Sequence, residues 1–172
     1  MQFSRSSQPV SLGLIFLVLL FVSVPVNASE SEIADRVLIN KSERTLILFK
    51  GDRVLRSMDV ALGLLPKGRK ITEGDFKTPE GTYRLTERNS ASDFFLSIQI
   101  SYPDADDIRH AKLRGLSPGG QIMIHGQPNN PTHSVEYYRS ANWTNGCIAV
   151  SNADMVDIWL MTKPDTPIQI LP

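Results

Sequence analysis

Two residues of this chain could do chemistry together: Cys147, its single cysteine, and His125, which precedes it. A thiolate is a strong nucleophile, but a free thiol with a pKa of about 8.5 is only a few per cent ionised at neutral pH. A neighbouring imidazole can take the thiol proton, stabilise the thiolate as imidazolium and later return the proton to a leaving amine. The pair therefore predicts acyl transfer through a thioester.

Residue types alone leave other interpretations open. A lone cysteine is often an inert core residue, and a histidine near a strand end is often a hydrogen-bonded structural residue. The remaining histidines, His110 and His133, are expected at the surface. Together with His125 and Cys147 they lack the ligand spacing of a zinc site, so no metal or other cofactor is predicted.

The neighbours of the pair favour catalysis. His125 and Cys147 each lie beside a glycine at the end of a short apolar segment. Strand ends place side chains in clefts, and glycine lets a substrate or another backbone approach closely. The attacked carbonyl develops negative charge, which donors in the turn formed by Thr144, Asn145 and Gly146 could hold as an oxyanion hole.

The elements that must position this pair are mainly strands. Apolar segments with alternating or β-branched residues, bounded by polar turns, predict a strand. Such segments occur at residues 35–40, 44–49, 54–62, 82–88, 94–100, 121–125, 147–150 and 166–171. The expected fold class is therefore a mainly β sandwich or barrel.

One or two short helices are expected beside these strands. Charged and small residues at helical spacing predict an exposed helix over residues 104–114. A second helix is predicted over residues 152–161, with Asn152 as its cap. Residues 64–77 and 127–142 are predicted to be loops because of their glycine, proline and polar content, and residues 78–81 a turn that leads into the next strand.

The first 28 residues have the layout of a secretory signal. A stretch with one positive charge, Arg5, precedes an apolar run over residues 12–24, and Ala28 offers a plausible cleavage point. The run is shorter than the roughly 20 apolar residues of a membrane span, and retention as an N-terminal anchor is the alternative to cleavage. We therefore expect a signal peptide over residues 1–28, export to the periplasm or cell envelope, and one folded domain over residues 34–172.

The charge balance disfavours two classes of partner. The chain has 18 lysines and arginines, 18 aspartates and glutamates, and no basic block. Neither nucleic acid nor an anionic membrane surface is therefore expected as a partner, and membrane contact is expected only through an uncleaved leader. We expect a monomer, in which the single cysteine cannot form an internal disulfide.

Three motifs, in this order along the chain, resemble the L,D-transpeptidase (YkuD-type) catalytic domain family. They are residues 74–83 (GDFKTPEGTY), 122–126 (IMIHG) and 144–152 (TNGCIAVSN). The first is similar to the family's Lys-Thr-Pro-x-Gly segment before a strand. The resemblance extends over about residues 37–171, which is nearly the whole of the predicted domain.

The resemblance implies a β-rich, sandwich-like catalytic domain that acts on peptidoglycan stem peptides in cell wall organisation, without a metal. The family's cysteine, matching Cys147, attacks the L-to-D peptide bond at the third stem residue. The acyl-enzyme then passes to an amine of another stem peptide, or to a D-amino acid in exchange. The family's histidine, matching His125, is the general base and acid, and Gly126 is the position whose carbonyl would orient it.

The sequence departs from the family pattern at two positions. The family commonly has Ser/Thr-His-Gly-Cys and an arginine two residues after the cysteine, where this chain has Asn145 and Ala149. Asn145 can form hydrogen bonds but cannot carry a proton or a charge, and Ala149 removes an anchor for a carboxylate. Hydrolysis of the same acyl-enzyme, by an L,D-carboxypeptidase or amidase, is thus the rival activity. A non-catalytic wall-binding module is the alternative of another class.

The long segment between the two motifs is rich in aromatic residues. Tyr137, Tyr138 and Trp143 could form a wall for a peptide or sugar, or could pin the segment in place, and the sequence leaves both open. Arg139 is expected to be a solvated charge, with recognition of a substrate carboxylate as the alternative.

Overall fold

Within residues 32–172, which are the residues that the structure describes, the computed structural model contains eight strands and three short helices. The predicted mainly β class is confirmed, with three helices in place of one or two. The predicted leader over residues 1–28 lies outside the described residues. None of the described helices is both long and apolar enough to cross a membrane.

Strands β1 (Arg36–Asn40), β2 (Thr45–Lys50) and β3 (Arg53–Asp59) form an antiparallel meander. Buried residues alternate with more exposed ones along β1 and β2, as expected when one face of a sheet packs on the core. Strand β8 (Pro167–Leu171) pairs in parallel with β1, so the first and last strands of the domain are neighbours.

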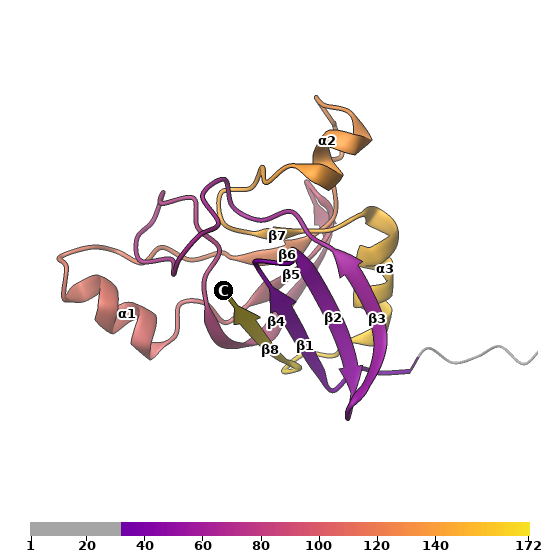
Figure 1. Cartoon of the computed structure of the whole chain (residues 1–172), viewed down its shortest axis with the longest axis horizontal. Helices are drawn as coiled ribbons and strands as arrows, with labels where there is room; N and C mark the ends of the chain where they lie inside the picture. The colour runs from indigo at the N-terminus through magenta and orange to yellow at the C-terminus, as the bar shows by residue number, and fades with distance from the viewer. Residues whose placement is uncertain (1–31) are drawn as a thin grey trace, which may run out of the picture. The chain divides into compact units, whose positions relative to one another are not determined.

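Strand β4 (Gly81–Ser92) connects two parts of the sheet. Its first residues pair with β8, and its later residues pair with β5 (Phe95–Ile100). The register shifts after Leu85 and again after Asn89, and such irregularities bend a strand. Beyond β5 follow β6 (Met123–His125) and β7 (Ile148–Ala149), which gives the order β3-β2-β1-β8-β4-β5-β6-β7 (Figure 1).

The residues that follow β3 close this sheet on its far end. Ala61 and Ala149 exchange two backbone hydrogen bonds of 2.8 Å, and Leu64 N donates to Thr144 O at 3.0 Å. The segment after the first edge strand therefore pairs with the chain on both sides of Cys147. The closure places the nucleophile candidate where three chain segments meet.

The core lies between the two parts of the sheet and the helix α3 (Asn152–Met161), which packs against β5. Its largest fully buried side chains come from the strands other than β3, from α3 and from the segment that follows β3: Ile39, Leu46, Leu48, Leu62, Tyr83, Leu85, Ile98, Ile100, Ile124, Ile148, Met155 and Ile158, with Ile168 and Ile170 beside them. The guanidinium of Arg88 binds the end of α3, donating to Trp159 O at 2.7 Å and Thr162 O at 2.6 Å.

The helices differ from the sequence prediction in three respects. Helix α1 (Ala105–Lys112) is shorter than the predicted 104–114, because Asp104 caps it through a capping box. Helix α2 (Val135–Ser140) lies in residues 127–142, so the prediction that this whole stretch is a loop was wrong. Its single buried residue, Tyr138, provides no helical periodicity to detect.

The predicted cap of α3 was also wrong. Ser151 is the N-cap, and its side chain accepts from Asp154 N at 3.1 Å. Asn152 is instead the first residue of the helix. Its side chain accepts a hydrogen bond from Gln127 N. In Figure 1, α1 and α3 lie at opposite sides of the sheets, and α2 projects beyond β7.

Candidate active site

The parallel pairing of β6 with β7 brings His125 and Cys147 to the same face of the sheet. His125 lies opposite Ala149 in the register, and Cys147 precedes Ala149 by two residues. Side chains two residues apart along an extended chain point to the same face. Both residues accordingly line one cavity of about 460 Å³.

His125 has a defined tautomer. Its Nδ1 lies 2.7 Å from Gly126 O, and because a carbonyl oxygen only accepts, Nδ1 carries the hydrogen and donates it. In the neutral ring Nε2 is then unprotonated and is the nitrogen that can take a proton. The carbonyl of Gly126 thus contacts the imidazole, and its role in orienting a catalytic histidine stays a prediction.

A side chain does not fit at position 126. A Cβ built on Gly126 would lie 2.6 Å from Asn152 Oδ1 and 3.0 Å from Phe94 O. Asn152 uses that same oxygen to accept from Gln127 N at 2.8 Å. Instead of capping α3, Asn152 therefore holds the backbone that follows the His-Gly pair.

Two aromatic rings pack against the imidazole of His125. The ring centroids of Phe94 and Trp143 lie 4.6 Å and 5.6 Å from that of His125, whose exposed fraction is 4%. This burial lowers the pKa of His125 to about 4, against the opposing effect of the hydrogen bond to Gly126. At neutral pH the ring is therefore neutral and able to accept a proton.

Cys147 is a half-buried thiol. Within residues 32–172, its Sγ makes its hydrogen bond to Gln121 O, at 3.7 Å, rather than to His125. Burial raises the pKa of Cys147, although a backbone hydrogen bond from Met123 and the charge of Lys70 oppose the rise. At neutral pH the two groups are thus a thiol and a neutral imidazole, and any attack by the sulfur would require the thiol proton to move.

The turn before Cys147 uses most of its own donors. Gly146 N donates to Thr144 Oγ1 at 3.1 Å, and Thr144 Oγ1 donates to Cys147 O at 2.7 Å. Thr144 N donates to Leu62 O at 3.2 Å. Of the three residues predicted to hold an oxyanion, Thr144 and Gly146 therefore shape the turn, and exposed Asn145 lines the cavity with its side chain uncommitted to these bonds.

The aromatic side chains within residues 127–143 both pin this segment in place and line the cavity, which are the two roles that the sequence left open. Tyr138 is buried, its hydroxyl accepts from Thr132 N at 3.0 Å, and Trp143 Nε1 donates to Tyr138 O at 3.1 Å. These contacts pin the segment. Tyr137, Tyr138 and Trp143 also line the cavity, together with His133, whose ring lies 4.2 Å from that of Tyr137.

Other candidate residues lie apart from the cavity. Arg139 is exposed, 4.0 Å from Glu136, and borders a neighbouring cavity instead. His133 is exposed as predicted, whereas His110 is half-buried on α1 with its Nδ1 shielded from solvent. Ala149, at the position where the family has arginine, is buried against Ala61.

The charge of the cavity wall is low. Among the described residues that line it there is no lysine or arginine, and its polar groups are Ser92, Gln121, Thr132, Thr144 and Asn145 with the two histidines and the tyrosines. A substrate carboxylate in this cavity would therefore meet neutral donors.

Two residues of the site were missed in the sequence. Phe94 borders the imidazole from the turn between β4 and β5, and Asn129 fixes that turn with three hydrogen bonds of 2.9 Å to Ser92 O, Asp93 O and Phe95 N. Neither belongs to a motif, and an asparagine in a proline-containing loop is too common a feature to have revealed this contact.

Comparison with protein families gives one match over most of the chain. The model of the L,D-transpeptidase catalytic domain (YkuD) matches residues 34–170, which include the cavity with Cys147 and His125. No curated protein matches this chain significantly.

Several solved structures have a similar fold. Pgp2 from Campylobacter jejuni, described as a helical cell shape determining protein, is 24% identical, with a TM-score of 0.60 over 84% of this chain and 51% of Pgp2. Bd1075 from Bdellovibrio bacteriovorus is 25% identical, with a TM-score of 0.54 over 84% of this chain and 52% of Bd1075. An L,D-transpeptidase from Stackebrandtia nassauensis is 11% identical, with a TM-score of 0.54 over 86% of this chain and 61% of that one. The chain spans about half the length of the first two proteins.

Proposed function

Because this chain belongs to the L,D-transpeptidase catalytic domain (YkuD) family, we propose that it forms a Cys147 thioester with a peptidoglycan stem peptide and transfers the acyl group to an amine. The observation that supports the proposal is the shared cavity, which is lined both by the single cysteine and by a neutral histidine with an unprotonated Nε2. The proposed place of action is the periplasm or cell envelope.

In the first half-reaction, Cys147 Sγ attacks the carbonyl carbon of the L-to-D bond while the thiol proton passes to His125 Nε2. The oxygen of the tetrahedral intermediate carries the negative charge, and we assign Asn145, which lines the cavity, as a donor to it. The carbon–nitrogen bond then breaks, and the imidazolium returns its proton to the leaving amine of the D-residue. A thioester and a free D-amino acid result.

In the second half-reaction, an acceptor amine attacks the thioester carbonyl and gives a proton to His125. The carbon–sulfur bond breaks, and the sulfur recovers that proton. Since the free protein has a thiol of raised pKa and an imidazole of pKa about 4, the ion pair forms only as each attack proceeds. The hydrogen bond from Nδ1 to Gly126 O stabilises the transient imidazolium.

Hydrolysis of the same thioester is the second candidate, and the composition of the cavity favours it. An acceptor stem peptide brings its own carboxylates, and the cavity wall offers no lysine or arginine among the described residues to bind them. Water needs no such anchor. The protein would then be an L,D-carboxypeptidase or amidase that trims stem peptides.

Mass spectrometry of muropeptides incubated with the purified protein distinguishes these functions. Transfer gives cross-linked dimers or exchanged D-amino acids, whereas hydrolysis gives only shortened stems. Intact-mass analysis should show an acyl adduct that is absent in Cys147→Ala. Identical products from the parent protein and Cys147→Ala would leave only the non-catalytic wall-binding function.

A role in cell wall organisation and cell shape follows from the same proposal. Pgp2, whose printed description is a cell shape determinant, shares the fold over most of this chain. Deletion of the gene, with complementation by the parent and by Cys147→Ala, tests the role through cell morphology. Equal rescue by both would contradict a catalytic contribution to shape.

A further inference from the structure

We propose that Lys70 is a positioning residue for Cys147: its buried ion pair with Asp75 folds residues 70–77 against the backbone that precedes the nucleophile and keeps a positive charge behind the thiol. The inference rests on the proposed function in so far as Cys147 is the nucleophile. Neither residue lines the cavity, so both would act through the turn rather than on substrate.

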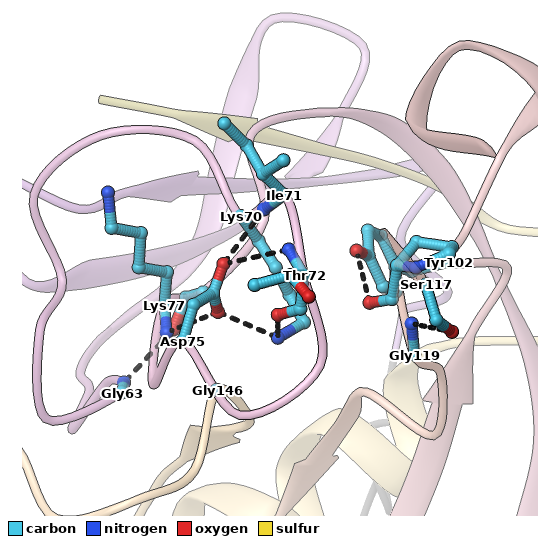
Figure 2. Close-up of polar contacts among 12 residues, drawn as sticks. Gly63, Lys70, Ile71, Thr72, Asp75, Lys77, Tyr102, Ser117, Gly119 and Gly146 are labelled. Carbon is cyan, nitrogen blue, oxygen red and sulfur yellow. Dashed lines mark hydrogen bonds and ion pairs between the residues drawn. The ribbon is translucent and has the colours of Figure 1, made fainter. Parts of the chain in front are cut away.

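The carboxylate of Asp75 organises its whole segment. It accepts from Lys70 Nζ at 2.8 Å, from Ile71 N at 2.8 Å, and from Thr72 N and Lys77 N at 3.1 Å each (Figure 2). Burial alone would raise the pKa of Asp75, but these bonds outweigh it and the pKa lies below its ordinary value. The segment is therefore folded around one ionised carboxylate.

Lys70 is fixed as firmly as its partner. The side chain is 4% exposed, and Nζ also donates to Thr72 O at 3.1 Å. An ammonium so deeply buried is stable only with charged and hydrogen-bonding partners. The turn that contains Ser117 binds the same segment, because Glu73 N donates to Ser117 O at 2.9 Å.

The folded segment touches the nucleophile turn directly. A Cβ built on Gly146 would lie 2.7 Å from Lys77 O, so this carbonyl occupies the place of a side chain immediately before Cys147. Gly146 has φ +129°, a conformation that glycine adopts readily and other residues rarely do. Gly63 forms a parallel bridge with Thr144, and Gly63 N donates to Thr78 Oγ1 at 3.0 Å. Movement of residues 75–78 would therefore move the backbone that carries the thiol.

The charge of Lys70 reaches the thiol as well. Lys70 is the charged side chain whose field lowers the pKa of Cys147, against the larger effect of burial. The other titratable groups near the Lys70–Asp75 pair include Lys41, Lys77, Tyr102 and, within the same segment, Glu73, and none of these contributes to the shifted pKa of Cys147. His125, which lines the same cavity as Cys147, is neutral at pH 7.

The experiment measures the reactivity of Cys147 without any substrate. The rate of alkylation of Cys147 by iodoacetamide is followed from pH 6 to pH 10 in the parent, Lys70→Met, Lys70→Arg and Asp75→Asn. Lys67→Met, which removes an exposed lysine of the same loop, is the matched control. Turnover of stem peptides gives kcat and KM for the same proteins, and thermal unfolding shows which are folded.

In Lys70→Met the alkylation midpoint is expected to rise by about one pH unit, because the stabilising charge is lost. The kcat should fall by about 10- to 100-fold with KM changed by less than about twofold, since the thiol is misplaced rather than the substrate. Lys70→Arg should restore much of both effects. In Asp75→Asn, kcat should fall similarly while the midpoint does not rise, since the lysine charge remains.

A folded Lys70→Met protein with the parent midpoint and kcat would overturn the inference. If Lys70→Met does not fold, Asp75→Asn decides: a lower kcat at constant KM supports the positioning role, and an unchanged kcat refutes it. A raised midpoint in Lys70→Met together with a lack of turnover in the parent would leave the inference standing and defeat the proposed function.

Discussion

The two long segments beside Cys147 are held in opposite ways. The segment behind it, residues 64–77, is held by buried charges: Lys70 pairs with Asp75, Arg69 with Asp107, and Lys41 binds its backbone at Gly68 O. The segment over the cavity, residues 127–143, is held by aromatic packing and neutral hydrogen bonds within it, and at its far end by half-buried Arg44, which donates to Arg139 O at 3.2 Å and to Ser140 O. We call them the backing segment and the covering segment.

The two kinds of contact differ in free energy and in how strictly they fix the backbone. A buried charge with a missing partner costs several kcal/mol, so we expect the backing segment to keep one arrangement against the turn that precedes Cys147. Aromatic contacts are worth about 1 kcal/mol each and tolerate sliding, so the covering segment can adapt to a substrate. The comparison predicts large, all-or-none effects behind the thiol and graded effects over the cavity.

The largest effect is expected for Lys41→Met. Lys41 is 3% exposed on its side chain, pairs with Glu80 at 2.7 Å and donates to Gly68 O and Thr78 O at 3.0 Å. Its loss leaves a carboxylate and two carbonyls without their donor, and should lower the free energy of unfolding by about 3 kcal/mol. Urea denaturation at pH 7 measures this, with Lys67→Met as a control expected within about 0.5 kcal/mol. A loss below about 1 kcal/mol would show that the charges are dispensable.

Acid should destabilise the site under the covering segment first. The folded pKa of His125 is about 4, below the ordinary 6.5, so between these values the unfolded chain binds more protons. Stability is therefore complete above pH 6.5 and falls as pH drops toward 4, by up to about 3 kcal/mol. His125→Gln should flatten this part of the curve. Asp75, with its lowered pKa, gives its full stabilisation above the ordinary pKa of an aspartate, and that stabilisation is lost only as the pH falls below this value.

Removal of one covering ring should partly reverse the burial of the imidazole. In Trp143→Ala, water gains access to His125, and its pKa should rise by about one unit toward the ordinary value. An NMR titration of the ring nitrogens reports it. Tyr137→Ala is the matched control, since among the ring contacts Tyr137 packs on His133 and Tyr138 and not on His125. An equal rise in both variants would mean that the segment, and not the ring, excludes water.

A single neutral hydrogen bond of the covering segment should matter less. Tyr138→Phe removes the acceptor of Thr132 N and should lower the free energy of unfolding only slightly, by much less than Lys41→Met. The KM for stem peptides should rise more than kcat falls. A collapse of kcat comparable to that of Lys70→Met would erase the distinction between the two segments.

The smallest effect is expected for Arg139→Ala. The pair with Glu136 is exposed on both sides at 4.0 Å, which is worth less than about 0.5 kcal/mol. Since Arg139 does not border the cavity of Cys147, kcat and KM should equal those of the parent. A raised KM would revive it as a carboxylate anchor.

The sequence predicted the elements with strong local patterns. Alternation in residues 35–40 and 44–49 located β1 and β2, and the motifs around His125 and Cys147 located the pair that shares the cavity. Contacts between distant segments left no local trace. Phe94 and Trp143 reach the imidazole from two loops, and no periodicity relates them.

The errors have similar causes. Asn152 and Ser151 are both good caps, and only the contact with Gln127 N decides that Asn152 works elsewhere. Lys70 and Asp75 stand in a loop rich in charge, where ion pairs are usually solvated. The segment that carries them is bound by the turn at residues 117–119 through Glu73 and by α1 through Arg69, and both partners are remote in sequence.

Because β1 pairs with β8, the sheet can be completed only after the last strand has been synthesised. Strand β1 is made first and β8 last, and β8 is also the partner of β4, so the sheet stays open until the final strand arrives. Such distant pairing is slow to form, because a long loop must close before the contact stabilises it. The surroundings of Cys147 therefore depend on pairing between distant strands, unlike those of a site built on one local hairpin. We therefore expect Cys147 to gain its backing segment and its neutral histidine late in folding, when β8 joins β1 and β4.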